Sequence, residues 1–338
     1  MSPLAAARSD SVLGVDIGGT KILAAVVGPD GEPGPSARAT TPAGEGPRAV
    51  LDTAISTART VLAAHGRSRG DGAGHSVRAC GIGTAGTVGP DGVISHATDT
   101  LPGWAGTDVR AAFADALDLP AVVLNDVHAA AVGERAYGAA RGHGTALVIW
   151  IGTGIGGAIV AADGVLSGRT GTAGAVGHVP VPVAVAVAVD GDGQRCTCGA
   201  WDHLEAYAAG PAITARYMRR AAAEGCGKIA DDQACLPAIA SLARAGEPLA
   251  LSVIEQAGTA IGGVLGGLAN VLDPDVIVLG GGVAAVADLL ERPVRRALAD
   301  QALPGPARVV LAFSGLGPMA AVIGASVAAR TSLLEVAP

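Results

Sequence analysis

Aromatic residues and cysteines are scarce in this 338-residue chain, and no stretch of it is strongly basic. Aromatic side chains make up 2% of the sequence although 50% of it is hydrophobic, so Ala, Val, Leu and Ile must build the core. The five cysteines are an odd number, which argues against a disulfide framework. The net charge of −7, without a basic stripe, argues against nucleic acid as a main partner.

Long uninterrupted apolar runs are also missing. The longest run, within residues 179–189, is far shorter than the roughly 18 residues that a membrane span needs, so we expect no membrane association. Residues 1–11 lack the apolar segment of a signal peptide. These features predict a cytoplasmic protein, and its length is sufficient for two lobes.

Glycine is abundant, with 51 residues that cluster where apolar runs end. Residues 12–27 read as an apolar run, a glycine turn and a second apolar run, which predicts a β-hairpin. The backbone N–H groups of such a turn can approach an anion closely, and a carboxylate at the strand end can hold hydrated Mg²⁺. The candidate residues are Asp16, Gly18, Gly19, Thr20 and Lys21. The alternative is a tight hairpin with a chance carboxylate.

The same pattern returns in residues 146–162, where the turn and its border contribute Gly152, Thr153, Gly154 and Gly156. A further apolar strand, 276–279, ends in three glycines at 280–282. Two hairpins, each followed by helices, predict two α/β lobes of similar plan with a cleft that could hold a triphosphate. A helix predicted at 248–272 contains five glycines, which indicates close approach of another backbone or of a nucleotide.

Asn125 and Asp126 follow a predicted buried strand, 121–124, and precede a predicted helix. A carboxylate in this position could act as a general base. The alternative is that the pair caps the helix, a common role for Asn and Asp.

These motifs occur in the order found in the ROK (repressor, open reading frame, kinase) family of sugar kinases, which the chain resembles over its whole length. The residues that carry the resemblance are 16–21, 125–126, 151–157, 177–178, 196–199 and 277–282. The resemblance implies a two-lobed actin-like, ribonuclease-H-like α/β fold with an interlobe cleft. We expect residues 1–125 to form the N-terminal lobe and 126–319 the C-terminal lobe, with a helix at 320–338 packing back on the first.

The resemblance also implies an ATP-dependent kinase, glucokinase-like, that uses Mg²⁺ and phosphorylates a primary hydroxyl of a hexose or hexose analogue. Both glycine hairpins would bind the ATP phosphates, Gly281 and Gly282 would pack near the adenosine, and Asp126 would be the general base. Polyphosphate in place of ATP stays open as the donor. A homodimer or a dimer of dimers is expected.

Family members hold a structural Zn²⁺ with one His and three Cys. In this chain the implied ligands are His178, Cys196, Cys198 and, where the third Cys would stand, His203. Imidazole is a good zinc ligand, so we expect zinc to be retained in this motif, 178–203; the alternative is that binding has been lost. The chain is longer than the family pattern by the alternating Val-Ala segment 183–189, which predicts an extended β-arm.

The implied sugar-binding positions are Gly86, Thr100, Asn125, Asp126, Ala175, His178 and Glu205. Two of them depart from the family, since Ala175 stands where a Glu is usual and Thr100 where an Asn is usual. Loss of two hydroxyl-binding groups predicts a substrate other than plain glucose, such as an amino sugar or a C7-cyclitol.

Two other functions are alternatives to the kinase. A sugar-responsive repressor needs an N-terminal DNA-binding domain, and only eleven residues precede Val12. A non-catalytic sugar-binding module would need neither Asp16 nor Asp126.

Overall fold

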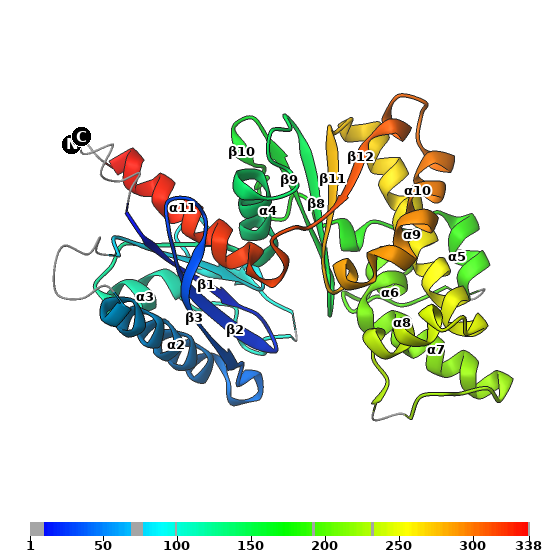
Figure 1. The fold of residues 1–338 in the computed structure, drawn as a ribbon, viewed down its shortest axis with the longest axis horizontal. Helices are drawn as coiled ribbons and strands as arrows, with labels where there is room; N and C mark the ends of the chain where they lie inside the picture. The colour runs from blue at the N-terminus through cyan, green and yellow to red at the C-terminus, as the bar shows by residue number, and fades with distance from the viewer. Residues whose placement is uncertain (1–9, 69–76, 99, 191–192, 231–232, 337–338) are drawn as a thin grey trace. The chain divides into compact units, whose positions relative to one another are not determined.

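The computed structural model describes residues 10–68, 77–98, 100–190, 193–230 and 233–336. Its contacts divide the chain into two compact α/β units (Figure 1). Unit 1 comprises residues 1–142, 163–173 and 315–338, and unit 2 comprises residues 143–162 and 174–314. The boundary of unit 1 lies at Gly142 rather than at the expected Asn125, because helix α4 (Asp126–Tyr137) packs on the C-terminal helix α11 (Ala320–Val336) within this unit.

Unit 1 is built on a sheet in the order β3-β2-β1-β4-β7, in which β1 and β2 form the predicted antiparallel hairpin. Its strands are β1 (Val12–Ile17), β2 (Lys21–Val27), β3 (Pro33–Thr40), β4 (Cys80–Thr84) and β7 (Ala121–Asn125), with short strands β5 (Thr87–Val88), β6 (Ile94–His96) and β10 (Gly164–Val165). Its other helices are α2 (Pro47–Ser68) and α3 (Val109–Leu117).

Side-chain alternation along β1 assigns the two faces of this sheet. Leu13, Val15 and Ile17 are fully buried in a cluster with residues of α2 and α3. The intervening positions face the other way, where α11 packs on β1 and β4. Asp16 therefore belongs to the α11 face. The last residues of the expected C-terminal helix, 337–338, lie outside the described part of the chain.

The Pro-Gly-Pro sequence at residues 33–35 does not prevent a strand from forming. Strand β3 occupies Pro33–Thr40 and pairs antiparallel with β2. Its prolines are tolerated because β3 is the edge of the sheet, where a missing N–H costs no ladder hydrogen bond.

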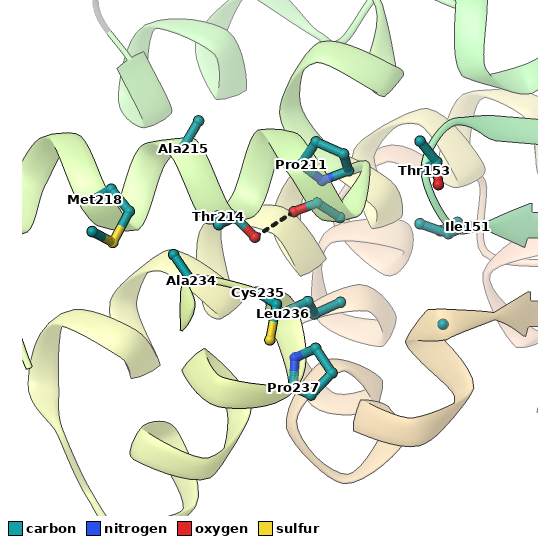
Figure 2. A pocket seen from close by; sticks show the side chains of 13 residues that line it. Ile151, Thr153, Pro211, Thr214, Ala215, Met218, Ala234, Cys235, Leu236 and Pro237 are labelled. Atoms are coloured by element: carbon teal, nitrogen blue, oxygen red, sulfur yellow. Dashed lines mark hydrogen bonds between the residues drawn. The ribbon is translucent and has the colours of Figure 1, made fainter. Parts of the chain in front are cut away.

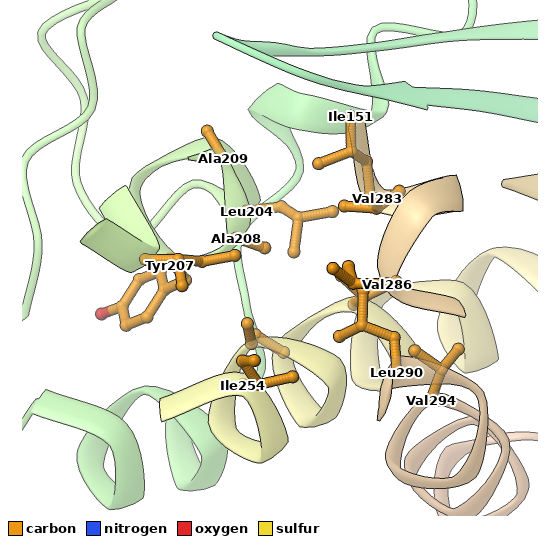
Figure 3. Close-up of a cluster of buried hydrophobic side chains, with 14 of the residues drawn as sticks. Ile151, Leu204, Tyr207, Ala208, Ala209, Ile254, Val283, Val286, Leu290 and Val294 are labelled. Carbon is orange, nitrogen blue, oxygen red and sulfur yellow. The ribbon is translucent and has the colours of Figure 1, made fainter. Parts of the chain in front are cut away.

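Unit 2 contributes β9, β8, β11 and β12 to the second sheet, whose full order is β10-β9-β8-β11-β12, and β8 and β9 form the second hairpin. Its strands are β8 (Ala146–Ile151), β9 (Ile155–Ala161), β11 (Val276–Gly281) and β12 (Val310–Phe313). Its helices are α5 (Val183–Asp190), α6 (Leu204–Ala208), α7 (Gly210–Glu224), α8 (Leu236–Arg244), α9 (Pro248–Leu272) and α10 (Ala287–Gln301). Ile151, Leu204 and Ile254 meet in the core of this unit, shown in Figure 3.

The glycines of α9 permit close approach of α10. A Cβ added to Gly262 would lie 2.3 Å from the carbonyl oxygen of Val294, and one added to Gly266 would lie 2.6 Å from that of Leu298. A Cβ at Gly258 would meet the ring of Pro293. Spacing of four residues places these three glycines on one face of the helix. The sequence predicted that either another backbone or a nucleotide approaches these glycines. At this face of the helix, the close neighbour is another backbone.

The alternating segment 183–189 is helical rather than an extended arm. Helix α5 begins after Pro182, whose carbonyl accepts hydrogen bonds from the N–H groups of Val185 and Ala186. It packs on α9, where Pro182 and Val185 lie near Gly263. The prediction of a β-arm was wrong because alternation favours a strand only where a sheet edge is available, and alanine favours helix. The helix leaves Val183 78% and Val187 61% exposed.

Two helical segments, 248–272 and 317–334, are long and apolar enough to cross a membrane by length and composition alone. A search for uninterrupted apolar runs does not detect these two segments, because Gly, Ser and Thr interrupt them. In the first segment 72% of the most apolar window is buried inside the structure, and in the second 50%. Burial of most of the first window is typical of a helix in a protein core.

Candidate active site

The turn of the first hairpin lies at the end of β1 in unit 1. The turn closes with a hydrogen bond from the Gly18 N–H to the Lys21 carbonyl, 3.0 Å, and the Thr41 hydroxyl donates to the Gly18 carbonyl, 2.6 Å. Thr100 lies directly against Gly19, since a Cβ added to that glycine would be 2.1 Å from the Thr100 methyl group. The exposed Thr20 and half-buried Lys21 complete the turn. Two hydrogen bonds therefore anchor the turn at Gly18.

Asp16 and Asp126 are brought together by the parallel strands of unit 1. β1 pairs with β4, and β4 pairs with β7, so the carboxyl ends of all three strands lie at one edge of the sheet. Gly83 of β4 lies beside Asp126, since a Cβ there would be 3.5 Å from the Cα of Asp126. The pKa of Asp16 is raised to about 7, chiefly by burial and then by the negative charge of Asp126, while Lys21 lowers it.

Asn125 caps helix α4. Its side-chain oxygen accepts from the N–H groups of Val127 (2.9 Å) and His128 (3.1 Å), and its amide nitrogen donates to the Gly86 carbonyl, 3.0 Å. Asn125 therefore has the helix-capping role that was the alternative to a catalytic role for the pair. The amide also ties β7 to the loop of Gly86, whose φ of +100° favours glycine.

Asp126 is the first residue of α4, and one of its oxygens accepts from the Val127 N–H at 2.9 Å. Burial raises the pKa of Asp126, and the hydrogen bonds from Val127, its own N–H and Asn125 oppose that rise. A carboxylate at a strand end with a raised pKa has the proton affinity that a general base needs.

The second glycine turn, in unit 2, is held from two sides. The Gly210 N–H donates to the Gly152 carbonyl at 2.9 Å, and the Ile155 N–H donates to the Glu205 carboxylate at 2.8 Å. Gly281 makes close approach to β8 possible, since a Cβ there would be 2.4 Å from the Ile151 carbonyl oxygen. Gly156, expected in the turn, lies within β9 opposite Trp150.

A cavity of about 690 Å³ opens beside this turn. Figure 2 shows its mostly apolar walls, in which Thr214 of α7 donates a hydrogen bond to the Gly210 carbonyl. The turn contributes Gly152 and Thr153, and Gly282, the residue after β11, also lines the cavity. Much of the wall comes from α7 and α8, including Pro211, Met218, Leu236 and Pro237.

No motif in the sequence identified α7 and α8 as parts of this wall. The available signals were Pro211 and Pro237, each at the first turn of a helix. These prolines indicate where the helices begin, but they do not indicate that the helices line a cavity.

The four sequence-predicted metal ligands lie together in unit 2. The ligand atoms of His178, Cys196, Cys198 and His203 are all within 4.8 Å of one another. Sγ of Cys198 is 3.2 Å from Nδ1 of His203, and Sγ of Cys196 is 3.7 Å from Nδ1 of His178. These separations suit the edges of a tetrahedron with bonds of about 2.0–2.3 Å, so the donor set fits Zn²⁺.

The loop that holds these ligands is fixed by Asp202, which has a φ of +59°. Its carboxylate accepts from the Gln194 N–H and the Tyr207 hydroxyl, and these hydrogen bonds lower its pKa. The left-handed backbone of this non-glycine residue is thus accompanied by hydrogen bonds from its side chain.

Glu205 connects the ligand loop to the glycine turn. One oxygen accepts from the Thr197 hydroxyl at 2.7 Å, while the other accepts from the Ile155 N–H at 2.8 Å. Ala175 and His178 are exposed neighbours in the short 3₁₀ turn 176–178, where the His178 N–H donates to the Ala175 carbonyl. Of the expected sugar-binding residues, Gly86, Thr100, Asn125 and Asp126 are thus in unit 1, and Ala175, His178 and Glu205 in unit 2.

Comparisons with known proteins agree with this architecture. A family model described as "ROK family" matches residues 12–332. A glucokinase from Halalkalibacterium halodurans is 32% identical over 324 residues, with 92% of each chain covered. An N-acetylmannosamine kinase from Yersinia pseudotuberculosis is 30% identical over 324 residues, covering 95% of this chain and 99% of that protein. The crystal structure of a ROK family glucokinase from Streptomyces griseus in complex with glucose and AMPPNP is 30% identical, with a TM-score of 0.80, and covers 95% of this chain and 99% of its own.

Proposed function

Because the chain belongs to the ROK family, whose actin-like fold it has, we propose that it is an ATP-dependent kinase that phosphorylates a primary hydroxyl of a hexose or hexose analogue. The observation that carries this proposal is the carboxylate pair at the edge of the unit 1 sheet. Asp126 accepts the proton of the attacking hydroxyl, and its raised pKa favours that step. A protein that only binds sugar has no use for such a pair.

Each glycine turn offers backbone N–H groups that suit a phosphate, and the first turn also has a carboxylate for a metal ion. Asp16 would hold hydrated Mg²⁺, and a cation bound beside it would lower its pKa from about 7. The N–H groups of the turns and the Lys21 ammonium neutralise phosphate charge, which is the main requirement of phosphoryl transfer. The apolar 690 Å³ cavity beside Gly282 is large enough for an adenine ring and its ribose.

The cluster of two cysteines and two histidines fits a closed structural Zn²⁺ site. A bound ion would fix loop 193–203 and hold His178 in one ring orientation. Through the Thr197–Glu205 hydrogen bond, that loop also fixes the carboxylate that anchors the second glycine turn. We assign His178 and Glu205 to the sugar hydroxyls because the resemblance to the ROK family implies these roles.

The preferred substrate is inferred to be a glucose-like ring altered at one secondary position, such as an amino sugar or a cyclitol. Ala175, exposed beside His178, offers a methyl group where a carboxylate would accept hydrogen bonds from hydroxyls. Loss of such a hydrogen bond costs about 1.5–3 kcal/mol. The relatives do not distinguish between these substrates. A protein named glucokinase is 32% identical to this chain, and one named N-acetylmannosamine kinase is 30% identical.

An assay of ADP release with a panel of hexoses, amino sugars and cyclitols tests both the kinase activity and the preferred substrate. Turnover with at least one ring is expected. Absence of ADP release from ATP with every ring, together with absence of sugar phosphate formation from polyphosphate, contradicts the kinase assignment. If glucose exceeds every analogue by more than about tenfold in kcat/KM, the altered-ring inference is wrong and the kinase remains. We further infer a cytoplasmic enzyme that forms a homodimer or a dimer of dimers, which light scattering after gel filtration measures.

A further inference from the structure

His128 lies in the first turn of helix α4, two residues after Asp126, and the proposed function does not use its side chain. His128 is half-buried, and its Nε2 is 3.3 Å from the carbonyl oxygen of Ala173. A carbonyl oxygen can accept a hydrogen bond but cannot donate one, so Nε2 carries the proton and is the donor. Burial lowers the pKa of His128, and the hydrogen bond to Ala173 opposes that change. The ring is therefore neutral near pH 7 and donates to this carbonyl.

The carbonyl that accepts this hydrogen bond belongs to a closed loop of unit 1, residues 167–173. The loop is closed by the Ala173 N–H, which donates to the Ser167 carbonyl at 3.1 Å. Gly171 of the loop lies against β5, since a Cβ there would be 3.0 Å from the Thr87 methyl group. Helix α4 and strand β5 thus both hold the loop within unit 1.

The 167–173 loop leads directly into residues that we assign to the sugar. Gly174 and Ala175 follow it, and His178 comes three residues later. Gly174 has a φ of +86° and packs on β9, since a Cβ there would be 2.8 Å from the Gly157 carbonyl oxygen. One residue separates Ala173 from Ala175, so a shift of the loop end also moves residue 175.

From this arrangement we infer that His128 is a positioning residue for the acceptor sugar, because its hydrogen bond to Ala173 holds the chain that carries Ala175. The inference rests on the proposed function, in which residue 175 faces the sugar. Asp126 does not depend on the imidazole, since its carboxylate accepts from the backbone N–H of Val127. Loss of the imidazole should therefore weaken sugar binding and leave the general base in place.

Three substitutions separate the hydrogen bond from the packing of the ring. His128→Phe keeps a planar ring and removes the N–H group. His128→Gln keeps a donor, because the amide nitrogen of Gln lies about as far along the side chain as Nε2 of His. In His128→Asn the amide nitrogen corresponds to Nδ1 and is too close to the helix backbone to reach the carbonyl.

Steady-state kinetics on the full chain use the ring with the highest kcat/KM in the ADP-release panel. The KM for this ring should rise about three- to tenfold in His128→Phe and His128→Asn, as expected for the loss of one neutral hydrogen bond. In His128→Gln it should stay within about twofold of the original value. The KM for ATP and kcat should change by less than about twofold in all three variants, because a weaker hold on the sugar affects only its binding.

Limited proteolysis with trypsin measures the same hydrogen bond without any kinase activity. Arg169 lies in the 167–173 loop and is exposed, so trypsin can cut after it when the loop opens. The rate of this cleavage should rise about three- to tenfold in His128→Phe and stay near the original value in His128→Gln. Arg141 is also exposed and also lies in unit 1, so cleavage after it is the internal control and should not change.

His96→Phe makes the same substitution at an exposed histidine of unit 1, on β6, and should leave the KM values and both cleavage rates unchanged. An unchanged sugar KM in His128→Phe overturns the inference, and so does unchanged cleavage at Arg169. Equal impairment of His128→Gln and His128→Phe also overturns it, because the packing of the ring would then be responsible. Absence of turnover by the unchanged protein contradicts the proposed kinase instead, and cleavage at Arg169 still tests the hydrogen bond.

Discussion

The negative charge of Asp126 acts together with burial to raise the pKa of Asp16 to about 7. The two residues are far apart in the sequence and become neighbours because β1, β4 and β7 run parallel in one sheet. A divalent cation would relieve their repulsion. The pair is therefore suited to hold a cation on one carboxylate and accept a proton on the other.

Asp126→Asn tests the general base. The amide keeps the shape and one acceptor of the carboxylate but cannot take a proton. We expect kcat to fall by at least ~10² with almost unchanged nucleotide affinity. Steady-state kinetics and nucleotide titration measure the two quantities. Asp115→Asn, at an exposed position of α3, should leave kcat unchanged, and near-normal turnover by Asp126→Asn would remove the assignment.

Asp16 should make the apoprotein less stable as pH rises. Its pKa is raised from 3.8 to about 7 on folding, so the folded state keeps a proton that the unfolded state has lost. The free energy of unfolding therefore falls between pH 3.8 and about 7 and changes no further above it. Asp16→Asn should flatten that dependence, which urea unfolding with EDTA at pH 5 and pH 8 measures. An equal slope in both proteins contradicts the raised pKa.

Two glycines of α9 offer a matched pair for stability. Gly262→Ala places a methyl group against the backbone of α10, 2.3 Å from the Val294 carbonyl oxygen, and should destabilise the protein by about 1–3 kcal/mol. Gly267 has no atom within 4 Å of such a methyl group, so Gly267→Ala should stabilise it by about 0.5–1 kcal/mol. Urea unfolding gives both values. Equal effects would mean that α10 does not pack as closely as described.

Much of the architecture could be predicted because glycine turns bounded by apolar runs are local signals. Both hairpins form as predicted, and Asp126 follows its strand as expected. The close contact along α9 could also be predicted, since five glycines inside one helix need a reason.

The rest depends on tertiary neighbours that a local pattern does not contain. The Val-Ala segment 183–189 is a helix because α9 offers it a small-residue surface. Strand β3 forms because β2 presents a free edge to it. The cavity wall from α7 and α8 has no sequence signature, since an apolar lining residue looks like any core residue.

Zinc binding is tested by changing its least usual ligand. His203→Ala should lower zinc content well below one ion per chain and reduce thermal stability, because a three-ligand site is open to water. His203→Cys should keep the metal, since thiolate is an equally good ligand. Metal analysis of protein purified without chelator gives the occupancy. His96→Ala, at an exposed histidine of β6, is the control. Full occupancy in His203→Ala would mean that another residue is the fourth ligand.

Ala175→Glu tests substrate choice by restoring a carboxylate beside His178. The new acceptor should strengthen binding of a ring with the hydroxyl that faces it, worth about 1.5–3 kcal/mol, or roughly 10–150-fold in kcat/KM. The ratio of kcat/KM for glucose to that for the best analogue should therefore rise in the variant. Ala222→Glu, at an exposed position of α7, adds the same charge to the same unit and should leave the ratio unchanged. If the Ala175→Glu ratio stays at the original value, or if glucose is already preferred before the change, another group supplies the acceptor and residue 175 does not determine specificity.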